Sequence, residues 1–525
     1  MRRRSILAAP LAAVIPLRAR GQAPATPDIT VAFSTNVTSI DPHFHNANPN
    51  RTFSVHLFDR LVQQDVRQRI VPGLATAWRA TDATTWEFSL RPGVRFHDGQ
   101  PFTAADALAS LRRAGSVPNS PSSFGVYTKA IVNASAPEPD RLVLRTAVPY
   151  PLLPVDLSNV NIVPGRMEHA TTADFNAGRA AIGTGPFRFA AWLANERLDL
   201  DRNDDYWGGP PAWRRARLRI VPNDGARVAA LLARDVDVVD VVPIADIERL
   251  GADPGLQLIR SQTTRLIYAV MDQHRDVSPF VRGLDGQPLG RNPFRDVRVR
   301  HAVSMALNRD ALVQRILNGM GLPAGDVVPP GFFGATPGRV AKPFDADGAR
   351  RLLAEAGYPG GFQVTLHAPT DGFSADSAVA QAVAQMLVRV GIRAQLELVP
   401  WPIFVSRATR LEFSLFLSPA GAPTGEASIQ LRMLMATYDR ATGLGTLNRG
   451  RYSNPAYDRM LARAMTELDD ARRETLFQQT AALGLDDGGI VPVYFQVNAV
   501  GVRRGITYVP RTDEQIWAHE LRPAG

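Results

Sequence analysis

The sequence predicts an α/β fold with more than one lobe, because strands and helices alternate in two separate segments. In the first segment, "ARLRIV" (216–221) alternates apolar residues with arginines, as a half-buried strand does. Asn223 and Asp224 follow as a helix cap, and Val228 and Leu231 share one face of the helix they begin. A second strand, "DVDVVDVV", comes next, so the segment predicts a βαβ unit with parallel strands.

The second segment predicts another βαβ unit. In "GFQVTLHA" (361–368), every second residue from Phe362 is apolar over three positions, which is the period of a strand. Residues 375–390 then carry apolar side chains at helical spacing, and Gly391 ends the helix, where glycine adopts positive φ at low cost. "IRAQLELV" (392–399) alternates again and predicts the returning strand.

Further helices are predicted from their capping residues. Asn454 precedes Pro455, and this pair is typical of a helix start. Asp345 begins a helix that Gly357 closes. Residues 296–307 and 309–318 predict two consecutive helices with a break at Asn308.

Composition excludes several classes of site. The 525 residues are enough for about three domains. There is no cysteine, so disulfides, cysteine-ligated zinc, iron–sulfur clusters and cysteine nucleophiles are excluded. The formal charge is +9, and five of the arginines lie in the first twenty residues, which leaves +4 for the remainder. The densest basic stretch, "WRRARLR" (213–219), alternates like a strand and favours a solvated sheet face over a nucleic-acid groove.

Residues 1–25 have the pattern of an export signal. "MRRR" is a charged start, and the short apolar stretch that follows is interrupted by Pro10 and Pro16. Ala23-Pro24-Ala25 offers a cleavage pattern of small residues. Arg3 and Arg4 also fit a twin-arginine signal, and the sequence does not separate that export route from the general one.

The segment "LRPGVRFHDGQPFTAADALASLRRA" (90–114) raises the question of chemistry, because His97 and Asp98 stand together beside Gly99. Asp-Gly is typical of a turn, since both residues tolerate the left-handed region. Thr103 and Asp106 have the spacing of a capping box at the start of a helix. No nucleophile or acid stands at a motif spacing from His97, so we interpret this stretch as a turn.

Catalytic and nucleotide motifs are missing elsewhere as well. G-x-S-x-G, S-x-x-K, H-E-x-x-H and the P-loop do not occur, and neither lysine, Lys129 or Lys342, follows a glycine. His43 and His45 offer two imidazoles, too few for a metal site. The sequence therefore favours binding over catalysis.

The chain resembles the family 5 extracytoplasmic solute-binding proteins, which are the peptide, dipeptide and nickel receptors of ABC importers. The resemblance extends over about residues 28–523 and depends on the order of its motifs. These are "HLFDRLV", "VPGLATAW", "TWEFSLRPGVRFHDGQPFTAADA", "GTGPFRF", "NDDYWGG", "RNPFRDVRVRHAVSMALNRDAL", "RYSNPAYDRML" and "DDGGIVPVYFQVN".

The resemblance implies a two-lobed periplasmic binding protein of the class II type, with an additional α/β domain inserted in lobe one. Lobe one would comprise residues 26–61, 182–271 and 498–525. The inserted domain would be residues 62–181, and lobe two residues 272–497. Two crossing strands near "LIYAVMD" (266–272) and "VPVYFQVN" (491–498) would form the hinge.

The resemblance also implies where a ligand would bind. Ligands of open α/β sheets lie beyond the carboxyl ends of strands, which here is the loop 369–374. Dipeptide receptors of the family carry an arginine there for the peptide carboxylate, and an aspartate in a later loop for its ammonium group. This chain has Asp371, Gly372 and Phe373 in the first loop and offers only Glu426 in the second. A free dipeptide of the usual kind is therefore not predicted.

Six residues are candidates for ligand contact. Phe44, Asn46 and Asn48 come from the loop "DPHFHNANPN" (41–50), which would face the cleft from lobe one. Phe373 and Trp401 are apolar residues that suit a cleft wall or the core equally. Glu426 completes the set.

By this resemblance, the protein is the periplasmic substrate-binding component of an ABC importer. It would capture a peptide or peptide-like solute between its lobes and deliver it to permease subunits in the inner membrane. We expect a monomer that closes around its solute, without enzymatic activity, a cofactor, a metal site or a nucleic-acid partner. Two alternatives stay open, a receptor for nickel or another metal chelate and an exported hydrolase.

Overall fold

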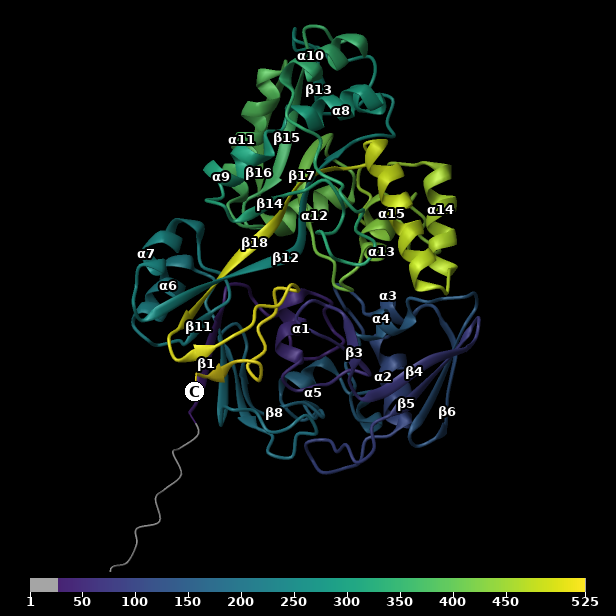
Figure 1. Ribbon diagram of the computed structural model, residues 1–525, viewed down its shortest axis with the longest axis vertical. Coiled ribbons are helices and arrows are strands. Elements are labelled where there is room, and N and C mark those ends of the chain that lie inside the picture. Colours follow the sequence, from purple (N-terminus) through teal and green to yellow (C-terminus); the bar gives the residue numbers. More distant parts are fainter. Residues whose placement is uncertain (1–26, 525) are drawn as a thin grey trace, which may run out of the picture.

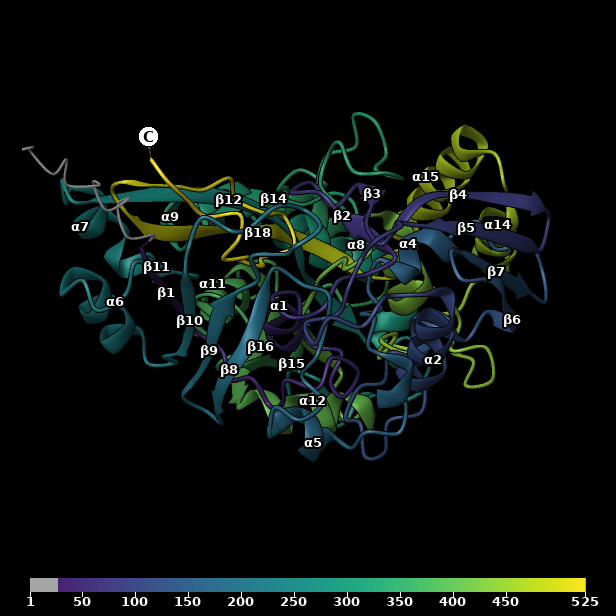
Figure 2. The ribbon, with the colours of Figure 1, turned by 90° about the horizontal axis from the view of Figure 1, so that it is seen from below.

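The computed structural model describes residues 27–524, which form two lobes and an additional domain. Figure 1 shows lobe two above, with lobe one and the additional domain side by side below it. Seen from below, in Figure 2, the strands of lobe one and the sheet of the additional domain lie at opposite ends of the molecule. The predicted export signal, residues 1–25, lies outside the described residues.

Within the described residues, lobe one is built on five strands of the large sheet, a separate pair of short strands (β19 and β20) and short helices. Its elements are β1 (Ile29–Phe33), α1 (Asn48–Ser54), β8 (Phe187–Leu193), β9 (Arg197–Arg202), β10 (Arg215–Ile220), α6 (Asp224–Leu232), β11 (Val238–Val239), α7 (Ile247–Gly251), β19 (Ile506–Thr507) and β20 (Arg522–Pro523). As predicted, Asn223 caps α6, since its Oδ1 accepts a hydrogen bond from the backbone N–H of Ala226. The strands flanking α6 are not neighbours, however, because β1 lies between them and pairs with both in parallel.

Lobe two contains the second predicted unit. β15 (Phe362–Pro369) and β16 (Ile392–Val399) pair in parallel from Phe362 opposite Ile392, and α11 (Asp376–Arg389) connects them. The predicted helix pair and the predicted caps Asp345 and Asn454 are also present. The other elements are β13 (Val281–Arg282), α8 (Val297–Ala306), α9 (Arg309–Arg315), β14 (Gly321–Pro323), α10 (Ala346–Glu355), α12 (Trp401–Thr409), β17 (Leu415–Ala420), α13 (Ala427–Gln430), α14 (Pro455–Thr466) and α15 (Asp470–Asp486).

Two long strands connect the lobes. β12 (Leu256–Met271) and β18 (Val491–Arg503) pair antiparallel and belong to one sheet that continues through both lobes. Figure 1 shows them crossing diagonally between the upper and lower parts. Their register shifts between Gln262 and Leu266, so the intervening residues leave the regular ladder at the boundary between the lobes.

The additional domain is a separate antiparallel sheet in the order β4-β5-β7-β6. It follows α1 in the chain and precedes β8, so it is inserted within lobe one. Its elements are β2 (Val62–Gln64), β3 (Ile70–Pro72), β4 (Ala75–Asp82), β5 (Thr85–Leu90), α2 (Ala104–Ala114), α3 (Gly125–Thr128), β6 (Ile131–Glu138), β7 (Arg141–Thr146), α4 (Leu153–Leu157) and α5 (Thr172–Asn176), where the last helix packs toward lobe one.

The segment around His97 is a turn with a structural role. Gly99 has φ +86°, and the backbone N–H of Gly99 bonds to the carbonyl of Phe96. The His97 Nδ1 accepts from the Gly183 N–H at 3.2 Å, and its Nε2 lies 3.1 Å from the Gly185 carbonyl. Burial lowers the pKa of His97 to about 4, so the ring is neutral and attaches the turn to lobe one.

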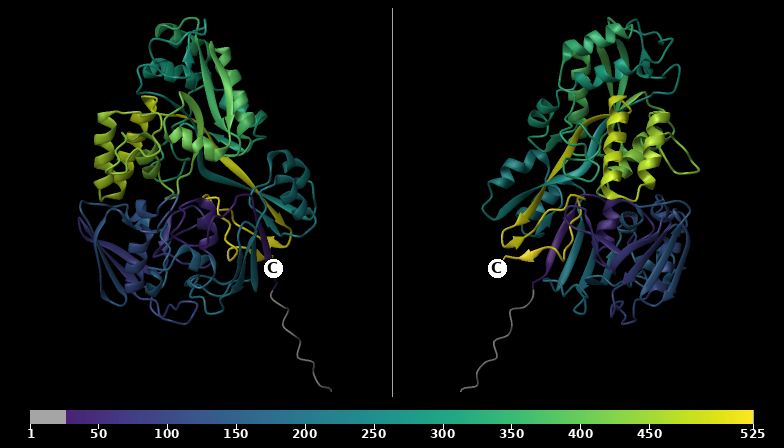
Figure 3. Two further views of the ribbon diagram at one scale, coloured as in Figure 1. Left: turned by 180° about the vertical axis from the view of Figure 1, so that it is seen from behind. Right: turned by 45° about the vertical axis from the view of Figure 1, so that its right-hand side comes forward.

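Lobe two also contacts the inserted domain directly, along a surface that we call the seam. The seam consists of Tyr150, Leu152, Val155 and Asp156 of the inserted domain and Arg432 of lobe two. Leu152 and Val155 pack into the apolar core of lobe two. Figure 3 shows α14 and α15 standing directly above the inserted domain, so the two parts face each other along this side of the molecule.

Candidate ligand-binding site

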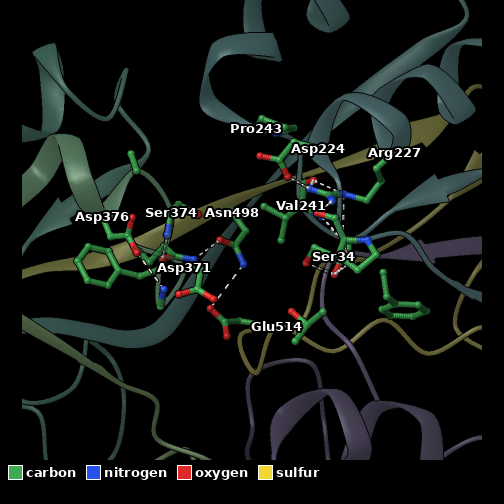
Figure 4. A pocket seen from close by; sticks show the side chains of 18 of the residues that line it. Ser34, Asp224, Arg227, Val241, Pro243, Asp371, Ser374, Asp376, Asn498 and Glu514 are labelled. Atoms are coloured by element: carbon green, nitrogen blue, oxygen red, sulfur yellow. Dashed lines mark hydrogen bonds and ion pairs between the residues drawn. The ribbon is translucent and has the colours of Figure 1, made fainter. Parts of the chain in front are cut away.

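A cavity of about 810 Å³ lies between the lobes beside the crossing strands. This volume is within the range of pockets that enclose small ligands. Figure 4 shows its walls, with Ser34, Asp224 and Arg227 on one side and Asp371, Ser374 and Asp376 on the other. The first wall belongs to lobe one and the second to lobe two, so a molecule in this cavity would contact both.

The wall of lobe one forms where β1 and β11 end. Ser34 follows β1, and its backbone N–H and hydroxyl both donate to Asp240, which follows β11, at 2.8–3.0 Å. Arg227 of α6 is almost fully buried, and it donates to the carbonyls of Val221 and Val241. It also pairs with Asp224 at 2.6 Å and approaches Asp240 at 3.8 Å. The arginine therefore holds these loops together.

The floor of the cavity is a hydrogen-bonded chain of side chains from the crossing strands and the C-terminal segment. Gln496 donates to Asn498 at 2.6 Å, and Asn498 to Glu514 at 3.5 Å. Glu514 accepts from Arg265 of β12, whose Nε lies 2.9 Å from its Oε1. Gln496 also accepts from the backbone N–H of Ser374 at 3.3 Å, which connects the floor to lobe two.

The wall of lobe two is the loop that follows β15. Asp376 begins α11, and its carboxylate accepts from the backbone N–H groups of Gly372 and Ser377 at 2.9 and 2.8 Å. Burial raises the pKa of Asp376, since only 4% of the residue is exposed. Asp371 is exposed, and its Oδ1 accepts from the backbone N–H of Trp401 at 2.7 Å. Phe373 adds an apolar surface.

A second cavity, of about 590 Å³, lies between the inserted domain and lobe two. Phe332 and Phe333 line it together with Leu152, and Glu426 and Arg473 add charged groups. Burial raises the pKa of Glu426 to about 7, and the Ser428 hydroxyl donates to its carboxylate. Gln68, which also lines this cavity, donates from its side chain to the Ala422 carbonyl of lobe two at 2.8 Å.

The structure places the six predicted contact residues in three settings. Asn48 and Phe373 line the larger cavity, and Glu426 lines the smaller one. Phe44, Asn46 and Trp401 line neither. Trp401 stacks on Phe404 at 5.8 Å against the core of lobe two.

Phe44 and Asn46 instead belong to contacts with the inserted domain. The Phe44 carbonyl accepts from the Ser120 hydroxyl at 2.6 Å, and the Asn46 side chain lies 3.5 Å from the Tyr127 hydroxyl. The loop 41–50 turns toward α3 before it reaches the larger cavity at Asn48, and contact of Phe44 and Asn46 with a ligand stays a prediction.

Several cavity residues were missed by the sequence analysis, although one signal was available for two of them. Ser34 and Asp240 directly follow the strands β1 and β11, so the rule that located the loop 369–374 would also have found them. Arg265, Asn498 and Glu514 meet only through the crossing of distant segments, and no local pattern marks them.

Residues 27–524 show neither a metal-ligand cluster nor a membrane-spanning helix. No group of three or more histidine, aspartate or glutamate side chains there is arranged to hold a metal ion. No helix within the same range has both the length and the apolar character needed to cross a membrane.

Comparisons with known proteins agree with this geometry. The model of the family "Bacterial extracellular solute-binding proteins, family 5 Middle" matches residues 69–441. The glutathione-binding protein GsiB of Pectobacterium atrosepticum is 28% identical over 464 residues, which is 86% of each chain. GsiB of Escherichia coli K12 is 27% identical over 474 residues, with the same coverage.

Solved structures show the same fold. HbpA2 from Haemophilus parasuis matches with a TM-score of 0.79 and 22% identity, over 95% of this chain and all of that one. DppA from Helicobacter pylori, an ABC transporter-associated periplasmic binding protein in complex with the peptide STSA, matches with a TM-score of 0.78 and 21% identity. That match covers 94% of this chain and 98% of the other. Because the family model covers well over half of the sequence, the chain belongs to the family 5 bacterial extracellular solute-binding proteins.

Proposed function

We propose that this protein captures a peptide or peptide-like solute in the periplasm, between its two lobes, and delivers it to permease subunits in the inner membrane. Membership in the family makes it the solute-binding component of an ABC importer. The finer proposal, a peptide-like solute, is supported by two relatives that are named for binding glutathione and by a solved structure that contains a bound peptide.

The observation that carries the proposal is the larger cavity, because it is lined from both lobes and from the two strands that connect them. A solute that contacts both walls binds the closed arrangement more tightly than the open one, and it shifts the population toward closure by that difference. Of the residues that the structure describes, no histidine lines either cavity, so neither shows the pairing of a nucleophile with a histidine base that a hydrolase would use.

Native mass spectrometry of protein purified without added ligand tests whether a solute is retained. Small-angle scattering then tests closure. We expect the radius of gyration to be smaller with the retained solute than after its removal by partial unfolding and refolding. A solute that binds without compaction would contradict the mechanism.

Two substitutions locate the binding event. Thr370 lines the larger cavity from an exposed loop, so Thr370→Trp should fill part of the cavity and abolish retention of the solute. Thr466 is an exposed threonine near the end of α14, away from both cavities, and Thr466→Trp is the matched control. Equal retention by both variants would place the solute elsewhere.

A further inference from the structure

The larger cavity carries an excess of negative charge. Seven charged side chains line it, and five are acidic, which leaves a formal charge of −3. The acidic residues are Asp224, Asp240, Asp371, Asp376 and Glu514, and the basic ones are Arg227 and Arg265. A space enclosed by protein screens such charges less than bulk water does, so this excess acts strongly on any charged solute.

The positive charges of Arg227 and Arg265 are already neutralised by carboxylates of lobe one and of the cavity floor. Arg227 pairs with Asp224 and Asp240, and three backbone carbonyls take its remaining N–H groups. Arg265 pairs with Glu514 through two of its nitrogens. Neither supplies an unpaired positive charge for a carboxylate of a solute.

Two carboxylates on the wall of lobe two have no such partner. Within residues 27–524, no arginine, lysine or histidine lies within ion-pair distance of Asp371 or Asp376. Asp376 is buried, and among the described residues its carboxylate accepts from the backbone N–H groups of Gly372 and Ser377 and, at 3.5 Å, from the Ser377 hydroxyl, all of them uncharged donors. The groups that face it are the carboxylate of Asp371 and the hydroxyl of Tyr494 on β18. Closing the lobes would remove more water from both carboxylates, which is costly unless a positive charge arrives with the solute.

The N-termini of α6 and α11 also face the cavity, and helix N-termini attract anions. Each helix here begins with an aspartate, Asp224 or Asp376, which compensates the dipole. The Ser377 N–H at the start of α11 and the Gly372 N–H of the preceding loop donate to Asp376 itself, and Asn223 accepts from the third residue of α6. These ends therefore do not form an anion site in competition with the carboxylates.

We infer that the solute taken by this cavity carries a net positive charge and places an ammonium or guanidinium group against Asp371 and Asp376. The inference rests on the proposed function and narrows its solute class. Glutathione, with two carboxylates and one ammonium group, would bring a net negative charge to a negative cavity. We expect this chain to exclude it, in contrast to the relatives named for binding it.

A competition experiment tests the charge class directly. The full chain is exposed at pH 7.5 to an equimolar mixture of peptide-sized solutes, and the captured molecules are identified by native mass spectrometry. The mixture contains peptide amides with lysine or arginine, uncharged acetylated peptide amides, and glutathione with glutamate-containing peptides as the anions. We expect capture of cations. Preferential capture of neutral or anionic solutes, or capture of none, overturns the inference.

Variants at the exposed carboxylate test the assigned contact. Asp371→Asn should weaken binding of the best cationic peptide amide by about tenfold to a hundredfold, since one charge-assisted hydrogen bond is lost. Asp347→Asn, on the exposed start of α10, is the matched control and should leave affinity unchanged. Asp371→Arg should reverse the preference toward anions. Unchanged selectivity in Asp371→Arg, with an unchanged melting temperature, overturns the inference.

Scattering on the same samples separates the inference from the proposed function. Capture of an anion with compaction would leave the receptor function intact and reject the charge class. Capture of a cation without compaction would support the charge class and reject closure as its mechanism.

Discussion

The larger cavity and the seam both lie where lobe two faces the rest of the molecule, but they differ in whether all of their carboxylates have a cationic partner. In the larger cavity, Asp371 and Asp376 face a polar space without a cationic partner. At the seam, the buried carboxylate of Asp156 accepts from Tyr150 at 2.6 Å and lies 3.5 Å from Arg432, which also donates to Tyr150 at 2.8 Å. The seam thus contains a cation for its buried carboxylate, whereas by our inference the cavity receives its cation from the solute.

This difference assigns separate tasks to the two sides. Apolar contacts and the buried Asp156–Arg432 ion pair at the seam favour contact between lobe two and the inserted domain with no solute present. The unneutralised carboxylates of the cavity oppose closure until a cation is bound. The free energy of closure is then the sum of two contributions. The seam contributes a favourable amount with or without a solute, and the cavity contributes an amount that depends on the solute.

The largest expected effect comes from breaking the seam. In Arg432→Met, the buried Asp156 loses its cation, and loss of one partner of a buried pair costs about 3–5 kcal/mol. Because opening the lobes returns the carboxylate to water, we expect the cost to appear as an increased radius of gyration in small-angle scattering and as weaker solute binding. Arg410→Met, which breaks an exposed pair with Glu412, is the control. Identical scattering of the two variants would show that the seam does not hold the lobes.

Two adjacent leucines provide a sharper test of the same side. Leu153 lies in the core of the inserted domain, whereas Leu152 packs into the core of lobe two. Leu153→Ala should lower the free energy of unfolding of the inserted domain by about 2–5 kcal/mol. Leu152→Ala should lower this free energy of unfolding less, and it should instead increase the fraction of molecules in the open form. Chemical denaturation together with scattering distinguishes the two, and equal unfolding curves would mean that the seam is part of one cooperative core.

Local patterns predicted much of lobe two and the position of one cavity wall. Alternation in β15 and β16, helical spacing in α11 and Gly391 at φ +100° specify the βαβ unit from neighbouring residues alone. The loop 369–374 followed from that unit, since a strand's carboxyl end is fixed once the strand is known.

The rest depends on contacts between distant segments. Strand β1 enters between β10 and β11, whose paired residues lie 187 and 207 positions further along the chain, and no local pattern in the sequence indicates these partners. Likewise Glu514 reaches Arg265 across 249 residues. The loop 41–50 was assigned to the cleft by the family resemblance, and its direction is set by bonds to Ser120 and Ser122 in the inserted domain.

A smaller effect is expected from pH on the cavity side. Burial raises the pKa of Asp376, so this carboxylate takes up a proton at a higher pH than an exposed aspartate does. A cation binds the deprotonated form, so its affinity should fall as the pH is lowered toward that pKa, by at most tenfold per pH unit. Titration calorimetry from pH 7.5 to 4.5 measures this, and Asp376→Asn should flatten the profile. Affinity that rises on acidification would contradict the assigned contact.

The smallest effect is expected at the exposed rim of the seam. Lys129 of the inserted domain donates to the Ala441 carbonyl of lobe two at 2.5 Å, and both groups lie in contact with water. Water replaces such a bond at little cost, so Lys129→Met should change the free energy of closure by less than about 0.5 kcal/mol. Solute affinity should therefore stay within about twofold in calorimetry. A loss of affinity as large as that expected for Arg432→Met would contradict this prediction. It would mean that exposed contacts such as this one, and not the buried pair of Asp156 and Arg432, hold the lobes together.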